Sequence, residues 1–118
     1  VSIGLLPGDR SVLHQRIAAR FDAMLAAGLE GEVETLRHRY SLHANLPSMR
    51  CVGYRQVWDV QHGLAARREL RDRGIYATRQ LAKRQITWIG NTLRPRLVDC
   101  LSAALPAIVA REVGALFD

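Results

Sequence analysis

The stretch from residue 77 to residue 88 limits the fold of this chain more than any other. In and beside it, Ile75, Ala82, Ile86 and Ile89 are apolar and follow one another at intervals of seven, four and three residues. These intervals return to the same face of an α-helix. We therefore predict an amphipathic helix that packs this apolar stripe against another element.

The same helix carries basic residues away from its apolar stripe. Arg79 and Lys83 lie one turn apart, Arg84 is beside them, and no Asp or Glu occurs between Ile75 and Thr92. Like charges four residues apart repel each other by roughly a few tenths of a kcal/mol. An anionic partner would remove this cost.

Positive charge is concentrated in the middle of the chain. The segment from Arg50 to Arg96 holds eleven Arg or Lys and only three Asp or Glu, a net charge of +8, whereas the rest of the 118 residues has a net charge of −2. Basic residues gathered in one region are typical of a surface that binds phosphates. The alternative is a solvated face on an Arg-rich protein, and composition alone leaves both open.

Several classes of protein are disfavoured by the sequence. No apolar run approaches the roughly 20 residues of a membrane span, and residues 1–6 lack the basic leader of a signal peptide. Cys51 and Cys100 lack metal-ligand spacing, and a disulfide framework is not expected, so the default is the reducing cytosol. Because the first residue is Val, we expect the chain to be a fragment or a processed product.

Apolar periodicity and turn residues predict a mostly helical chain with two short strands. In order, we expect a strand at 1–6, helices at 9–28, 29–40 and 48–63, a long helix from 64 to 88, a strand at 96–101 and a last helix from Ser102. The first strand either pairs with the second or belongs to a sheet outside this chain, since a single strand cannot stand alone.

The segment from Arg50 to Gln56 combines residue types that bind nucleic acids. Gly53 falls inside the predicted 48–63 helix, where glycine costs about 1 kcal/mol relative to alanine. A glycine at such a position usually lets a backbone or ligand approach closely. Arg50, Arg55 and Tyr54 flank it, two cations for phosphates and one ring that can stack on a base.

A second pair of arginines lies in the first predicted helix. Arg16 and Arg20 are one turn apart and could clamp a phosphate. The alternative is that both are solvated and face the acids Asp22 and Glu30.

Two of these segments resemble one enzyme family. Residues 50–56 (RCVGYRQ) and 77–88 (ATRQLAKRQITW) are similar to the C-terminal part of the tRNA dimethylallyltransferases, also called tRNA isopentenylpyrophosphate transferases. Residues 13–33 and the Leu-Pro-Ser at 46–48 fit the same family in the same register. The resemblance covers about residues 1–92, and two long motifs at the right separation make it specific.

The resemblance implies a fold and a division of the chain. The family has a P-loop-kinase-like α/β core, but no G-x-x-x-x-G-K-[ST] phosphate loop occurs in this sequence. We therefore expect a mainly α C-terminal fragment with a bundle of about five helices and one or two short strands, not catalytic alone. Residues 1–8 would be a strand of the core sheet, 9–92 a helical tRNA-contacting region and 93–118 a C-terminal strand and helix.

The resemblance also implies a reaction and a set of site residues. The family transfers a dimethylallyl group from dimethylallyl diphosphate to N6 of adenosine 37 in tRNA; this piece would bind the anticodon stem-loop. The implied tRNA-binding residues are Arg50, Cys51, Val52, Gly53, Tyr54, Arg55, Arg79, Lys83, Arg84, Gln85, Ile86, Thr87 and Trp88. Arg16 and Arg20 are implied as diphosphate ligands. Mg²⁺ would bind outside this chain, and the parent would be a bacterial, cytoplasmic monomer.

Two other classes of function are compatible with the residues. The first is a freestanding basic helical module that binds RNA or DNA and never had a kinase-like core. The second is a protein–protein interaction module, which predicts no salt-sensitive affinity for nucleic acids.

Overall fold

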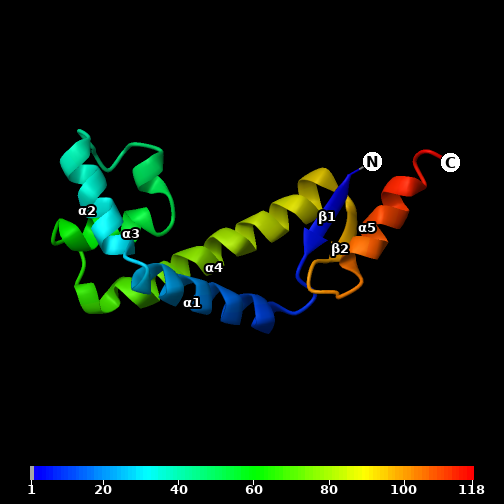
Figure 1. The fold of residues 1–118 in the computed structure, drawn as a ribbon, viewed down its shortest axis with the longest axis horizontal. Coiled ribbons are helices and arrows are strands. Elements are labelled where there is room, and N and C mark those ends of the chain that lie inside the picture. Colours follow the sequence, from blue (N-terminus) through cyan, green and yellow to red (C-terminus); the bar gives the residue numbers. More distant parts are fainter. Residues whose placement is uncertain (1) are drawn as a thin grey trace. The chain divides into compact units, whose positions relative to one another are not determined.

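The computed structural model describes residues 2–118, which contain five α-helices and two short strands (Figure 1). The elements in order are β1 (Ile3–Leu6), α1 (Arg10–Ala26), α2 (Leu29–Arg39), the 3-10 turn η1 (Ser48–Arg50), α3 (Tyr54–Gln61), the 3-10 turn η2 (Arg67–Glu69), α4 (Leu70–Trp88), the π-helical turn η3 (Ile89–Leu93), β2 (Arg96–Asp99) and α5 (Leu105–Gly114). The predicted mainly α class with two strands is confirmed. None of the helices described is both long and apolar enough to cross a membrane.

Contacts within the chain divide it into two compact units. One comprises residues 15–82, and the other comprises the segment up to residue 14 together with 83–118. Val1, part of the predicted first strand, lies outside the described residues.

The 15–82 unit has an apolar core to which every one of its helices contributes. The buried side chains are Ile17 and Phe21 of α1, Leu29 and Val33 of α2, Met49 of η1, Val57 and Trp58 of α3, and Leu70 and Ile75 of α4. Met49, Val33 and Val57 are the largest side chains that are fully buried. The apolar stripe of α4 thus finds its partner in this core at Ile75, as the periodicity predicted.

The other unit is built on a parallel pair of strands. β1 and β2 are in register from Ile3 opposite Arg96 to Leu6 opposite Asp99, which is the first of the two alternatives that the sequence left open for the first strand. Arg96 is also bound to Glu112 of α5, with Nη1 2.6 Å from Oε2. A parallel pair needs a long crossover connection, and here the helical unit lies within that connection in the sequence.

Three predicted helix starts were wrong, each because a tighter turn precedes the helix. Residues 48–50 form a 3-10 turn and α3 begins only at Tyr54, α4 begins at Leu70 after the 3-10 turn η2, and α5 begins at Leu105 rather than Ser102. The Oγ of Ser102 accepts a hydrogen bond from the Ala104 N–H at 3.2 Å, inside the turn that leads into α5.

Gly53 is consequently not inside a helix. It is the residue immediately before α3, with φ +96° and ψ −66°. L-residues with a side chain rarely adopt this backbone conformation. Glycine is therefore required here by the backbone turn. Close approach by another part of the described chain is not the reason, because a Cβ built on Gly53 would meet nothing nearer than Met24 Cε at 3.5 Å.

Candidate nucleic-acid interface

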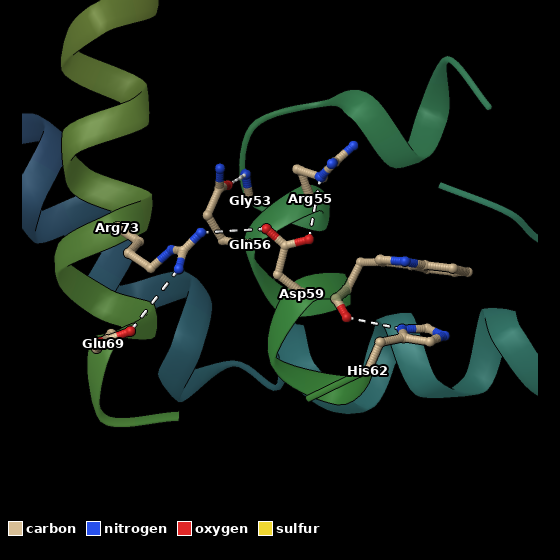
Figure 2. A network of polar contacts seen from close by, with 8 residues as sticks. Gly53, Arg55, Gln56, Asp59, His62, Glu69 and Arg73 are labelled. Atoms are coloured by element: carbon tan, nitrogen blue, oxygen red, sulfur yellow. Dashed lines mark hydrogen bonds and ion pairs between the residues drawn. The ribbon is translucent and has the colours of Figure 1, made fainter. Parts of the chain in front are cut away.

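The turn at Gly53 fixes where the first basic motif ends and α3 begins. The side-chain Oε1 of Gln56 accepts a hydrogen bond from the Gly53 N–H at 2.7 Å (Figure 2). This is the backward half of a capping box, and it satisfies one N–H that the start of a helix leaves free. As a result Arg50 and Cys51 are exposed before the turn, whereas Arg55 lies in the first turn of α3.

Tyr54 is held by a neighbouring helix. Its hydroxyl donates a hydrogen bond to Oε1 of Glu32 in α2. The hydrogen bond to the Glu32 carboxylate, together with partial burial, raises the pKa of Tyr54 above its usual value. The hydroxyl of this half-buried side chain is thus already engaged, so any stacking on a base would use the exposed part of the ring.

Arg55 is paired within α3 to a buried acid. Its Nε lies 3.3 Å from Oδ1 of Asp59, four residues later, and Nη2 of Arg73 in α4 lies 3.5 Å from Oδ2 of the same carboxylate (Figure 2). Asp59 is 8% exposed, the one buried charged residue among those described. Sequence reasoning missed Asp59, although the four-residue spacing from Arg55 was a usable signal.

Stacked rings pack at the C-terminal end of α3. The ring of His62 stacks on the ring of Trp58, with centroids 4.0 Å apart. Its Nδ1 lies 2.9 Å from the Trp58 carbonyl oxygen (Figure 2). Arg37 of α2 places its guanidinium carbon 5.7 Å from the centre of the Trp58 ring. These contacts fix the orientation of α3 against α2 and thereby the position of Arg55.

The second motif lies along α4 and is largely exposed. Arg79, Lys83, Arg84, Gln85, Thr87 and Trp88 are exposed, and Ile86 is half-buried. Among residues 2–118, no acidic side chain forms an ion pair with Arg79, Lys83 or Arg84. Trp88 keeps 55% of its surface exposed, which leaves an aromatic face beside these cations.

Other arginines of the basic segment serve the fold. Arg67 Nε and Nη2 each lie 3.0 Å from a carboxylate oxygen of Glu30. Arg71 Nε and Nη2 lie 2.5 and 2.9 Å from the oxygens of Asp22. Hydrogen bonding to Arg71 holds the pKa of Asp22 below its usual value. Such two-pronged pairs satisfy the guanidinium fork internally, so the high net charge of the middle segment overstates the charge available to a ligand.

Arg16 and Arg20 are exposed on α1. The expectation that they face Asp22 and Glu30 was wrong, because Arg71 and Arg67 pair with those acids instead. Neither Arg16 nor Arg20 forms an ion pair within the part of the chain that the structure describes. Their role as diphosphate ligands stays a prediction.

The described residues do not fit a divalent metal. No group of three or more His, Cys, Asp or Glu side chains that could hold a metal ion lies among residues 2–118. Mg²⁺ prefers oxygen ligands in a near-octahedral arrangement, and this part of the chain does not offer them.

The first motif lies within one unit, whereas the second motif is divided between the two. Residues 50–56 and Arg79 belong to the 15–82 unit, whereas Lys83 to Trp88 continue α4 in the other unit. Cys51 is exposed, with its sulfur 3.5 Å from the Pro47 carbonyl oxygen, and Val52 is half-buried.

Comparison with known proteins identifies relatives along the whole chain. The sequence model of the IPP transferase family matches residues 1–92. A tRNA dimethylallyltransferase from Dechloromonas aromatica is 61% identical over all 118 residues, which correspond to 38% of its length. One from Burkholderia multivorans is 56% identical over 98% of this chain and 35% of its own.

Two solved structures have the same fold as this chain. The tRNA isopentenylpyrophosphate transferase of Bacillus halodurans superposes with a TM-score of 0.82 at 29% identity, over 98% of this chain and 38% of that one. The tRNA delta(2)-isopentenylpyrophosphate transferase of Staphylococcus epidermidis gives 0.78 at 27% identity, over 97% and 36%. The chain thus spans little more than a third of the length of the relatives it matches.

Proposed function

This chain belongs to the IPP transferase family, and from that premise we propose that it is the tRNA-holding part of a tRNA dimethylallyltransferase. In this proposal the whole protein transfers a dimethylallyl group from dimethylallyl diphosphate to N6 of adenosine 37. The residues described here bind the anticodon stem-loop and do not catalyse the transfer alone. The names of the relatives support the reaction class.

The observation that carries the RNA-binding part is the division of the cations. Arg67, Arg71 and Arg73 are satisfied by acids of the same chain. Arg79, Lys83 and Arg84 are exposed without such partners among residues 2–118. Unpaired cations on one helix repel each other, and an RNA backbone relieves this repulsion while it releases its own counterions.

The proposed task follows from the chemistry of base modification. An enzyme that reacts with N6 of an adenine must take the base out of its stack, which costs roughly a few kcal/mol. Contacts to the phosphates on either side of the base can offset this cost. We assign this role to residues 50–55 and to the α4 residues Arg79, Lys83, Arg84, Gln85, Ile86, Thr87 and Trp88.

Arg16 and Arg20 have a different role in this proposal. The bond from the allylic carbon to the diphosphate oxygen breaks as the bond to N6 forms, so negative charge grows on the leaving diphosphate. Two exposed guanidinium groups one turn apart on α1 can stabilise that charge. The Mg²⁺ requirement, the monomeric state and the cytoplasmic location of the parent protein remain part of the proposal.

Binding of an anticodon stem-loop across a salt series tests this function. One loop carries adenosines at 36, 37 and 38, and a matched loop lacks them. We expect affinity that falls steeply with salt and a preference for the adenosine loop. Salt-sensitive binding without that preference would mean that this chain contacts only the RNA backbone, as a freestanding nucleic-acid module would. No binding to either loop would refute the proposal.

A further inference from the structure

Asp59 is a buried acid that contacts two arginines from different helices. The residue is 8% exposed, with Arg55 Nε at 3.3 Å and Arg73 Nη2 at 3.5 Å from its two oxygens. Removing a carboxylate from water is costly unless cations and hydrogen bonds replace the water. At Asp59 the two guanidinium groups supply this compensation.

The two arginines are held in different ways. Arg73 also approaches Glu69, with Nη1 3.9 Å from Oε2, so two acids surround it (Figure 2). Arg55 approaches Asp59 with its Nε, and among residues 2–118 neither of its Nη groups makes a hydrogen bond. Its side chain is 43% exposed, and its outer nitrogens lie on the side away from Asp59 (Figure 2).

This geometry separates a holding edge of the Arg55 guanidinium from a binding edge. Nε lies 3.3 Å from a carboxylate oxygen of the buried acid, while the Nη groups keep up to four N–H donors in a plane. A planar fork whose orientation is already fixed loses less conformational freedom when it binds a phosphate. A neutral residue in place of Asp59 would leave Arg55 charged but free to rotate.

We propose that Asp59 is a positioning residue, which fixes Arg55 so that its Nη groups bind a phosphate of the RNA. The inference rests on the proposed function, since it assumes that Arg55 contacts tRNA. It goes beyond that function because it assigns a role in RNA affinity to an acid that the RNA does not touch.

The proposal predicts a change in RNA affinity on neutralising Asp59 that is opposite in sign to the change expected from net charge alone. If Asp59 acted only as a nearby negative charge, its removal would lessen repulsion of the RNA and tighten binding. If Asp59 positions Arg55, its removal weakens binding although the net charge of the protein becomes more positive.

The experiment compares four variants of the full chain for binding to the adenosine stem-loop at constant salt. Asp59→Asn keeps the shape of the side chain but removes its charge, and Arg55→Ala removes the cation. The double variant tests whether the two act together. Asp72→Asn is the matched control, because it removes the same charge from an acid of α4 whose side chain is 85% exposed. Circular dichroism and thermal unfolding show which variants remain folded.

We expect Asp59→Asn to lower affinity about three- to tenfold, within the range for net loss of one ordinary hydrogen bond. Arg55→Ala should lower it by a similar factor, and the double variant no further, because both changes remove the same contact. Asp72→Asn should leave affinity unchanged or slightly raised. Equal or tighter binding by Asp59→Asn, or additive losses in the double variant, would overturn the inference.

A fifth variant covers the case in which Asp59→Asn is unstable. Arg55→Lys keeps the charge on an exposed side chain but lacks the two-edged fork, so we expect at least a threefold loss, and full affinity would refute the positioning role. If the unaltered chain binds no stem-loop, the proposed function itself fails and the inference with it. If the unaltered chain binds and Asp59→Asn binds equally well, only the role of Asp59 is refuted and the proposed function stands.

Discussion

Gly74 of α4 lies directly against the ring of Phe21 in α1. A Cβ built on Gly74 would be 2.0 Å from Cζ of Phe21, far inside van der Waals contact. Phe21 is only 3% exposed, so the ring cannot move aside into solvent. The absence of a side chain at residue 74 therefore sets how closely the two helices pack.

Gly74→Ala is expected to destabilise the protein by about 2 kcal/mol, within the usual range for overpacking of a core. The gain in helix propensity from alanine, about 1 kcal/mol, is too small to offset the clash. Urea unfolding followed by circular dichroism measures the change.

Gly31→Ala is the matched control for this substitution. Gly31 also lies within a helix, α2, but nothing lies within 4 Å of a Cβ built there. Alanine should therefore stabilise the protein by about 0.5–1 kcal/mol. A stabilising Gly74→Ala would show that the contact with Phe21 is not close in solution.

Gly53→Ala is expected to cost about 1–3 kcal/mol for a different reason. The site has room for a methyl group, but φ is +96°, which a residue with a Cβ adopts only at a cost of that size. A change to φ below zero would also move Arg55, so RNA affinity should fall together with stability. Unchanged unfolding by urea would contradict the turn described here.

The long helix, and the need of the first strand for a partner, could be predicted because both leave local signals. The stripe through Ile75 recurs at helical spacing, and an isolated strand demands a partner. The turn at Gly53 left no such signal, since the residues on both sides of it are compatible with a helix. Only the three-dimensional turn shows that glycine is needed there for its backbone angles.

The division of the arginines could not be predicted from the sequence either. Arg67 pairs with Glu30 across 37 residues and Arg71 with Asp22 across 49. Pairs at such separations depend on how the helices pack, and periodicity within one helix does not contain that information. Arg55 and Asp59, four residues apart in α3, were within reach of the spacing rule, but the burial that makes this pair important was not.

The pH dependence of stability should include a contribution from Asp99. Its carboxylate accepts hydrogen bonds from the N–H groups of Leu101 at 2.9 Å and Gly8 at 2.8 Å. These bonds lower the pKa of Asp99 below the usual 3.8. The charged form is favoured in the folded state, so the stabilisation is complete above pH 3.8 and is lost as the pH falls through the folded-state pKa.

Asp99→Asn should accordingly be less stable than the unaltered protein at pH 7, and the difference should shrink below pH 4. Urea unfolding of both proteins between pH 7 and pH 3 measures it. A difference that stays constant with pH would show that the two N–H groups do not depend on the charge of Asp99.

The α4 cations should account for most of the salt dependence of RNA binding. Replacement of Arg79, Lys83 and Arg84 by alanine removes three exposed cations. The slope of log affinity against log salt is negative, and each phosphate that is no longer neutralised reduces its magnitude by about 0.7–0.9. We therefore expect the magnitude of the slope to fall by about two to three. The free energy of unfolding should change little, since these side chains have no acidic partners among the described residues.

The control for this prediction removes the same charge elsewhere. Arg39, Arg68 and Arg111 are exposed and lie outside both motifs, so their joint replacement by alanine lowers the net charge equally. If binding depended on net charge alone, the slope would fall by the same amount in the two triple variants. A much larger fall in the α4 variant would locate the phosphate contacts on that helix, and equal falls would refute α4 as the surface that holds the RNA.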